Sequence, residues 1–210
     1  MESNKLDCNQ KNSHERDGRC MFDPEHHKYE IGGTAFRSVT TIISQFFPIF
    51  NPEEAIRKMR NGRSWNPNHR YWGMQDYEIK QAWEEKGISA AEQGTFLHEQ
   101  IENYYLGQTH EEPEEFELFR QFQNDHKSLE PYRTEWRIFD EAYQVAGTID
   151  FIAKNGNEFE MYDWKRSVKV IDKLNGQAII ENRWDQGFKG LSDMGHTSFN
   201  HYSVQLSPYR

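Results

Sequence analysis

Hydrophobic and polar residues alternate most clearly in the second half of the chain. Val145–Ala153 and Glu158–Trp164 are rich in β-branched and aromatic residues, which favour strands. Asn155 and Gly156 between them are the usual pair for a type I′ turn, which needs a positive φ at both central positions. The pattern therefore predicts two antiparallel strands joined by a two-residue loop.

The predicted turn fixes which residues of this hairpin face each other. Counting from it sets Asp150 opposite Met161 and Thr148 opposite Asp163. Because side chains alternate along a strand, Asp150, Asp163 and Lys165 are expected on one face. The two carboxylates would be diagonal neighbours with backbones about 7 to 8 Å apart, near enough to reach one point.

The rest of the chain reads as a mixture of short strands and helices. Ser89 and Glu92 have the spacing of a capping box, so a helix is expected from Ser89 to a stop at Gly107. Gly94 in its interior suggests close approach of another backbone or of DNA. The other expected elements are a hairpin over Lys28–Ile31 and Thr34–Arg37, a short helix from Ser38 or Thr40 to Gln45, helices from Pro52 to Asn61, from Asp76 to Lys86 and from Pro113 to about Lys127, a strand over Tyr132–Phe139, and a helix within Asn200–Arg210.

Length and composition indicate one decorated domain. Residues 1–20 are polar and are expected to form a flexible tail, while residues 21–210 suit a single domain with a helical region at 38–88 and a core at 89–210. Aromatic residues make up 14% of the chain, so the core is expected to depend on rings more than on aliphatic side chains.

Charge and cysteine content narrow the class of protein. The net charge is −9, which argues against a general nucleic-acid coat but permits a local basic groove. Two cysteines suit a reducing compartment and are too few for a four-cysteine iron–sulfur or zinc site. No secretory signal or long apolar run is present, so a cytoplasmic, non-membrane protein is expected.

Asp150, Asp163 and Lys165 are the candidate reactive groups. Two carboxylates that converge repel each other unless a cation lies between them, and oxygen ligands suit Mg²⁺ or Mn²⁺. A nearby lysine can orient water or neutralise charge on a reacting phosphate. The alternative is an ordinary Asp–Lys pair on the solvent side of a sheet.

Two basic segments are candidate contacts for nucleic acid. Residues 57–72 mix arginines with Trp65, Tyr71 and Trp72, which resembles a platform for single strands, although a solvated helix and buried loop would read the same way. Arg166 and Lys169 follow Lys165 and make the segment after the hairpin positive, which suits a phosphate backbone.

These residues resemble a known nuclease signature. Asp150 followed by Asp163-Trp164-Lys165 resembles the PD-(D/E)XK superfamily, in which an Asp and an Asp/Glu-x-Lys on the next strand form a metal-dependent phosphodiesterase site. The chain also resembles its RecB-like exonuclease branch in two further motifs, G-T-x-x-H-x-x-x-E and Q-x-x-x-Y. Those motifs are Gly94, Thr95, His98 and Glu102, and then Gln205 and Tyr209.

The resemblance implies a fold and a set of roles. The fold would be α/β (α+β), with a central mixed sheet flanked by helices. Asp150, Asp163 and His98 would hold the metal and Lys165 would act on the phosphate. Glu135 and Glu102 would be accessory residues. The alternative for Glu135 is a glutamate exposed on a strand, and the alternative for Glu102 is a surface hydrogen bond with His98. Gln205 and Tyr209 would contact DNA, on a final helix that is shorter than in relatives.

The expected function is a Mg²⁺- or Mn²⁺-dependent DNA nuclease of the repair and recombination type, acting as an exonuclease on single-stranded DNA ends. Alternatives are an endonuclease on the same core, a DNA-binding or interaction module without catalysis, and an unrelated small-molecule phosphoesterase. DNA or RNA preference, polarity and oligomeric state do not follow from the sequence.

Overall fold

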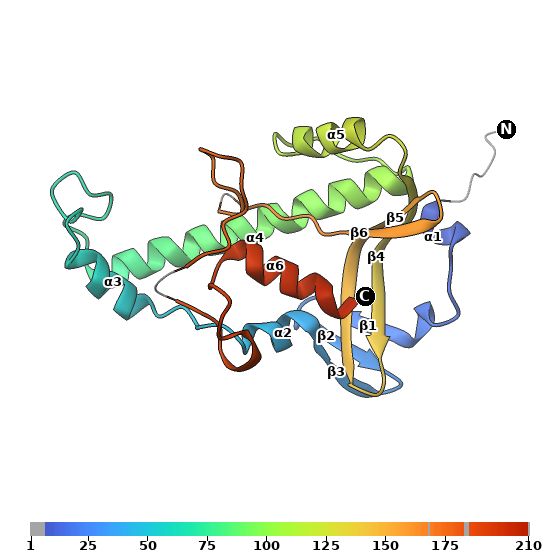
Figure 1. The fold of residues 1–210 in the computed structure, drawn as a ribbon, viewed down its shortest axis with the longest axis horizontal. Coiled ribbons are helices and arrows are strands. Elements are labelled where there is room, and N and C mark those ends of the chain that lie inside the picture. Colours follow the sequence, from blue (N-terminus) through green and yellow to red (C-terminus); the bar gives the residue numbers. More distant parts are fainter. Residues whose placement is uncertain (1–6, 168, 183–184, 210) are drawn as a thin grey trace. The chain divides into compact units, whose positions relative to one another are not determined.

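The structure is a computed structural model that describes residues 7–167, 169–182 and 185–209 (Figure 1). The described residues form two compact units, one from residues up to Pro48 together with those from Phe96 onward, and one from Ile49–Thr95. The domain expected for residues 21–210 therefore contains two units, and the helical one begins later than the expected region at 38–88.

A six-stranded mixed sheet organises the first unit, in the order β1-β2-β3-β5-β4, with β6 also paired to β5. Only the β3–β5 pair is parallel. The expected mixed sheet with flanking helices is thus confirmed at the level of fold class. The strands are β1 (Cys20–Asp23), β2 (Lys28–Ile31), β3 (Thr34–Ser38), β4 (Glu130–Asp140), β5 (Val145–Asn155) and β6 (Glu158–Tyr162).

Side-chain caps begin several of the helices, and one of them, Ser38, is expected from the sequence. The Ser38 hydroxyl accepts a hydrogen bond from the Thr41 amide, and the Asn51 side chain accepts one from Glu54. The α-helices are α1 (Cys8–Lys11), α2 (Val39–Ser44), α3 (Pro52–Arg60), α4 (Asp76–Leu106), α5 (Phe116–Asp125) and α6 (Ser198–Leu206). Three 3-10 turns are η1 (Asp17–Arg19), η2 (Lys189–Leu191) and η3 (Ser207–Tyr209).

Strand β5 is the centre of the sheet. Strand β4 pairs with β5 along almost the whole length of β5, so β3 and β6 share the other edge of β5. On that edge β3 pairs with Val145 and Ala146, and β6 pairs with Phe151 to Asn155. The stretch Gly147–Asp150 lies between them on that edge. There the ring of Tyr209, from the 3-10 turn after α6, approaches Gly147 so closely that an added Cβ would overlap it.

The expected register of the β5–β6 hairpin is wrong by one loop position. Asn155 pairs with Glu158, so the loop residues are Gly156 and Asn157. Gly156 has a φ of +62°, whereas Asn157 is not among the residues with positive φ. A positive φ at the first central position alone is the pattern of a type II′ turn, which takes glycine there. The same register places Asp163 directly opposite Asp150 rather than on the diagonal.

The two helices expected around residues 76–107 are one continuous helix, α4. Ser89 is therefore not an N-cap; its hydroxyl accepts from the Gln93 side chain one turn later. Strong helix formers on both sides of Gly87 and Ser89 outweigh the cost of these two residues. Gly94 has open space where a Cβ would be, so no other backbone among the described residues approaches it. The close approach of DNA stays a prediction. Gly107, with a φ of +69°, follows the helix as expected.

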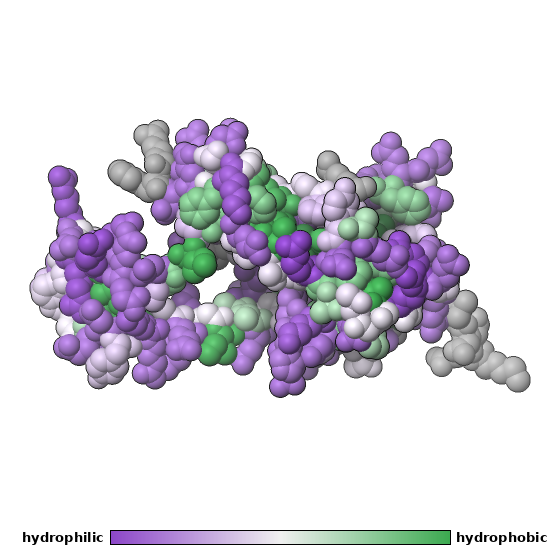
Figure 2. All heavy atoms as spheres, turned by 90° about the horizontal axis from the view of Figure 1, so that it is seen from below, coloured by the Kyte–Doolittle hydropathy of each residue, from purple (hydrophilic) through white to green (hydrophobic). Residues whose placement is uncertain are grey.

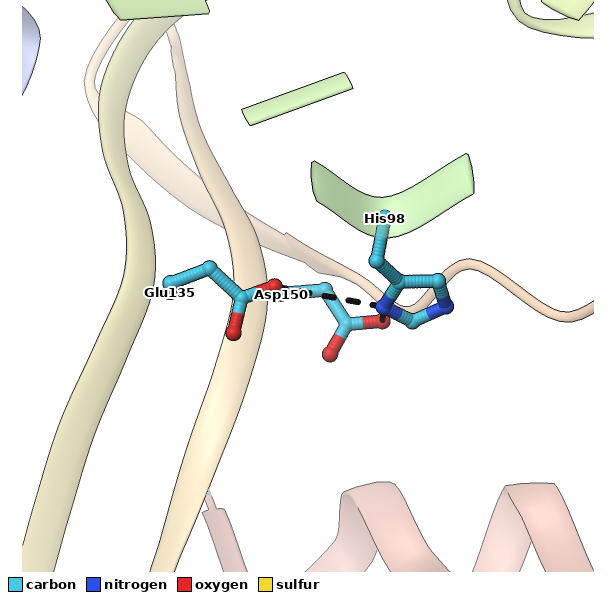
Figure 3. A group of neighbouring side chains, drawn as sticks. All are labelled: His98, Glu135 and Asp150. Atoms are coloured by element: carbon cyan, nitrogen blue, oxygen red, sulfur yellow. Dashed lines mark ion pairs between the residues drawn. The ribbon is translucent and has the colours of Figure 1, made fainter. Parts of the chain in front are cut away.

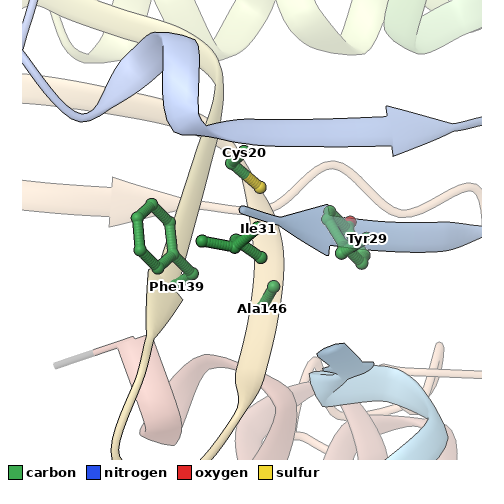
Figure 4. Packing of buried hydrophobic residues seen from close by; sticks show 5 residues of the cluster. All are labelled: Cys20, Tyr29, Ile31, Phe139 and Ala146. Atoms are coloured by element: carbon green, nitrogen blue, oxygen red, sulfur yellow. The ribbon is translucent and has the colours of Figure 1, made fainter. Parts of the chain in front are cut away.

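Three apolar clusters hold the first unit together. One joins Cys20, Tyr29 and Ile31 to Phe139 and Ala146 across the sheet (Figure 4). A second packs Leu97 and Ile101 of α4 against Phe116 and Phe119 of α5, and a third packs Val39, Ile43 and Phe47 with residues of α6. Rings dominate the second cluster, where Tyr105 stacks on Phe151 with centroids 4.2 Å apart. The aromatic core expected from the composition is confirmed there.

Hydrophilic residues cover much of the face seen in Figure 2, with apolar patches among them. Across the described ranges, none of the helices combines the length and apolar character that crossing a membrane requires.

The segment before β1 is held against the sheet from Asp7 onward, where a flexible tail was expected. The Asn9 side chain exchanges hydrogen bonds with the backbone of Thr134. Asp17 accepts from Arg133 at 2.8 Å and from the Trp136 indole at 2.9 Å. Polar side chains thus supply contacts that hydropathy patterning does not reveal. Residues 1–6 of the expected tail lie outside the described part of the chain.

We expect Gly147→Ala to lower the free energy of unfolding by about 1 to 3 kcal/mol, because the new methyl group must displace the Tyr209 ring. The matched control is Gly94→Ala, which has space and should raise stability by about 1 kcal/mol in the helix interior. Chemical denaturation measures both. Equal changes in the free energy of unfolding for the two substitutions would contradict the close packing at Gly147. So would an undiminished loss of stability from Gly147→Ala in a protein that also carries Tyr209→Ala.

We expect Asp17→Asn to cost about 1 to 3 kcal/mol at neutral pH, because it weakens charged hydrogen bonds. Partial burial would raise the pKa of Asp17, but hydrogen bonds from Arg133, His14 and Trp136 outweigh burial and hold it below 3.8. A lowered pKa stabilises the fold above the ordinary value, and this is lost as the pH falls through the folded value. The difference between wild type and variant should therefore shrink below about pH 4; exposed Asp125→Asn is the control, and a constant difference would refute the expectation.

Candidate functional site

Three acidic residues lie close together, Glu135 in β4, Asp150 in β5 and Asp163 directly after the end of β6. In β4 and β5, Thr134 pairs with Phe151 and Trp136 with Ile149, so Glu135 stands opposite Asp150. The β5–β6 register, continued by one residue, sets Asp163 opposite Asp150 on the other side. Neighbouring strands lie about 4.8 Å apart, so the three side chains share a small volume.

The backbone at Glu135 has an unusual conformation for a strand. Its φ is +46°, in the left-handed region that favours glycine. A non-glycine residue there costs of order 1 kcal/mol or more and persists only when its surroundings require it. The kink removes Glu135 from the regular ladder and leaves its side chain half-exposed beside Asp150. The expected strand position of Glu135 is confirmed, but its simple surface exposure is not.

The Asp150 carboxylate is almost completely enclosed. Its side chain is 10% exposed, and one oxygen accepts a hydrogen bond from the Trp164 amide at 2.8 Å. Burial, and next the negative charge of Asp163, raise the pKa of Asp150 to about 7, against the opposing effect of His98 and Lys165. A carboxylate in this position is poised to gain a positive partner.

His98 of α4 faces this acidic group (Figure 3). Its Nε2 lies 2.7 Å from the carbonyl oxygen of Trp164. Since a carbonyl only accepts, Nε2 carries the proton, and in the neutral ring the lone pair is on Nδ1. Nδ1 lies 3.5 Å from Asp150 and 3.9 Å from Glu135. Burial opposes protonation, but the hydrogen bond with Glu135 and the charge of Asp150 give the ring a net raised pKa.

His98, Glu135 and Asp150 have the chemistry of a metal-binding set. One ligand atom from each lies within 4.8 Å of the others. A backbone carbonyl that fixes the second ring nitrogen is the usual outer support of a metal-bound histidine. Two carboxylates suit Mg²⁺ or Mn²⁺, and the imidazole shifts the preference toward Mn²⁺ or a later transition metal. The residues present therefore fit a divalent cation.

Asp163 lies beside this group with partners of its own. One oxygen is 2.7 Å from Lys165 Nζ, and the other accepts from the Gln205 amide at 3.4 Å. The Asp163 side chain is 6% exposed, so the pair is not an ordinary one on the solvent side of the sheet. The expected trio of Asp150, Asp163 and His98 thus differs from the observed cluster, in which Glu135 takes the place of Asp163.

Of the remaining expected site residues, some contact the acidic residues and others do not. Gln205 reaches Asp163, but Tyr209 lies beyond the end of α6 in the 3-10 turn η3, so the two do not share one regular helical face. Pro208 accounts for the change, because proline has no backbone N–H to donate to the carbonyl four residues earlier and so cannot continue the α-helical bonding. Arg166 pairs with Glu115 at 2.7 Å. Glu102 is half-buried, and burial followed by the charge of Glu135 raises its pKa.

The basic and aromatic residues at 57–72 belong to the second unit. Arg60 pairs with Asp76 at 2.6 Å and lies over the Trp65 ring. The rings of Trp65 and Trp72 are 5.5 Å apart, and Trp72 is 46% exposed. Some of the cations in this segment are thus neutralised within the unit, and Trp72 offers a ring to solvent.

Comparison with known proteins adds no relative. No family model, curated protein or solved structure matches the chain. The resemblance to RecB-like nucleases therefore stays a prediction from the motif residues of the sequence.

We expect Mn²⁺ to raise the thermal midpoint of the protein. Binding at 100 times the dissociation constant stabilises a fold by about 2.7 kcal/mol, or roughly 5 to 10 °C for a chain of this size. Glu135→Gln and Asp150→Asn remove a ligand charge and should abolish the shift, whereas exposed Glu158→Gln should keep it. A shift of equal size in all four proteins would show that the ion binds elsewhere.

Proposed function

We propose that the protein is a divalent-metal-dependent DNA nuclease that hydrolyses phosphodiester bonds, acting as an exonuclease on single-stranded ends. The observation that carries the proposal is the convergence of Glu135 of β4, Asp150 of β5 and Asp163, the residue directly after β6. Like charges are costly at this spacing, and a cation with a phosphate is the ligand that would use all of them.

Each residue has a role in this proposal. His98, Glu135 and Asp150 would hold Mn²⁺ or Mg²⁺. When bound, the ion supplies Lewis acidity and lowers the pKa of a coordinated water. Lys165 would place its ammonium group on the phosphate and stabilise the charge that develops as the bond breaks. Asp163 holds Lys165 at 2.7 Å, and Gln205 fixes Asp163 from the other side.

A second candidate is a DNA-binding module that does not cleave. The specific observation in its favour is that the Lys165 ammonium, which would act on the reacting phosphate, already has Asp163 as a partner. Such a protein would bind DNA without need of metal. An endonuclease on the same core would cut closed circular single strands, which an exonuclease leaves intact.

We expect Asp163→Ala and Lys165→Ala to slow cleavage of end-labelled single-stranded DNA about 10²- to 10⁴-fold. Lys165→Ala removes the cation at the reacting phosphate, and Asp163→Ala removes the carboxylate that positions this cation. Reactions contain Mn²⁺ or Mg²⁺, with EDTA as the metal control. Lys154→Ala is the matched control, since Lys154 is an exposed lysine at the far end of β5.

Products distinguish the candidates. Progressive shortening that depends on metal and on both residues supports the exonuclease, and label at the 5′ or 3′ end reports its polarity. Unchanged cleavage by folded Asp163→Ala protein would refute the assignment. Binding without cleavage in either metal would favour the binding module.

A further inference from the structure

A cavity of about 650 Å³ lies directly beside Asp163 and Lys165. One wall is the segment that leaves the β5–β6 hairpin, through Ser167 and Lys173. The other wall is a face of α6. This volume is within the range of pockets that hold small organic ligands. Its position next to the proposed reacting groups makes it a candidate for the part of the substrate that adjoins the phosphate.

The α6 wall offers aromatic and hydroxyl groups from one helical stripe. Phe199, Tyr202, Ser203 and Leu206 recur at spacings of three and four, so they share a face. The helix is anchored from elsewhere, because Val204 packs with the α2 cluster. Asn200, which is 8% exposed, donates to the carbonyls of Ile180 and Gly195. The contacts that anchor α6 thus come from residues outside this stripe, and within it the Ser203 hydroxyl donates to the Phe199 carbonyl.

The charges at the cavity complement a phosphate. Lys165 and Lys173 both line it, and Lys165 Nζ lies 5.5 Å from the centroid of the Tyr202 ring. Asp163, the acidic member of the wall, is already paired with Lys165. An aromatic ring beside a cation, with hydroxyls nearby, suits a flat aromatic ligand that carries a phosphate. A nucleotide has this chemistry.

We propose that this cavity receives the base of the nucleotide next to the phosphate at Lys165, stacked on Tyr202 and lined by Phe199. The proposal builds on the nuclease assignment and specifies its substrate. A base enters a side cavity only when it leaves its stack and its partner strand, which costs least in a single strand. The cavity therefore selects single-stranded or frayed DNA over an intact duplex.

Binding is measured without cleavage, in EDTA, with a single-stranded oligonucleotide that carries 2-aminopurine at its end. Stacking quenches this fluorescent base, so the same titration reports affinity and base contact. Loss of one stacking ring weakens binding about 5- to 150-fold. We expect Tyr202→Ala to show this loss together with the loss of quenching, and Tyr202→Phe to keep both. Tyr143→Ala, at a tyrosine 76% exposed in the turn before β5, is the matched control and should behave as wild type.

A probe with an abasic terminal nucleotide completes the test. Wild type and Tyr202→Ala should bind it equally, because the base that the ring would stack on is gone. Wild-type affinity and quenching in a folded Tyr202→Ala variant would overturn the proposal, even if the protein cleaves DNA. Conversely, ring-dependent quenching in a protein that does not cleave would uphold the cavity and refute the nuclease. Binding of duplex as tightly as single strand would also overturn it.

Discussion

Repulsion among carboxylates on adjacent strands is the constraint on which this structure depends. Glu135 lies opposite Asp150 across β4 and β5, and Asp163 follows the end of β6 beside Asp150. Like charges so close to one another are destabilising. The fold compensates locally. The Trp164 amide donates to Asp150, Lys165 pairs with Asp163, and His98 approaches from α4. Trp164 and Lys165 follow the β5–β6 hairpin and His98 belongs to α4, so the carboxylates and the packing around them must form together.

Trp164 links these carboxylates to the hydrophobic core. Its amide donates to Asp150, its carbonyl accepts from His98, and its ring packs with Phe119 and Phe122 of α5. The same residue therefore orients two candidate ligands and is itself fixed by ring contacts. Close-packed protein cores tolerate little movement. The aromatic cluster of α4, α5 and Trp164 therefore sets the geometry of Asp150 and His98, which Trp164 contacts. The large aromatic share of the composition thereby contributes to the site as well as to stability.

The opposite edge of β5 shows how the last residues of the described chain complete the same region. Strands β3 and β6 leave Gly147–Asp150 unpaired between them, and the end of α6 with its 3-10 turn covers this gap. Gln205 contacts Asp163 there and Tyr209 packs on Gly147. The other face of α6 borders the cavity beside Lys165. A single short helix thus supports the carboxylates and lines the proposed base-binding cavity.

The sequence by itself determined the strands β4 to β6, the helix that carries His98, and the shared face of Asp150 and Asp163. The predicted shared face is correct although the predicted loop was misplaced by one residue. Moving a two-residue loop by one position shifts each cross-strand partner by two residues, and side chains alternate with period two. Only the tertiary structure decided that Glu135 joins the other two carboxylates, that His98 turns Nδ1 toward this group, and that α4 is one helix. It also decided the ordered segment from Asp7 and the cavity at Tyr202. These features depend on contacts between residues far apart in the chain, on a β-bulge between Pro131 and Arg133 and on a positive φ at Glu135, none of which local periodicity encodes.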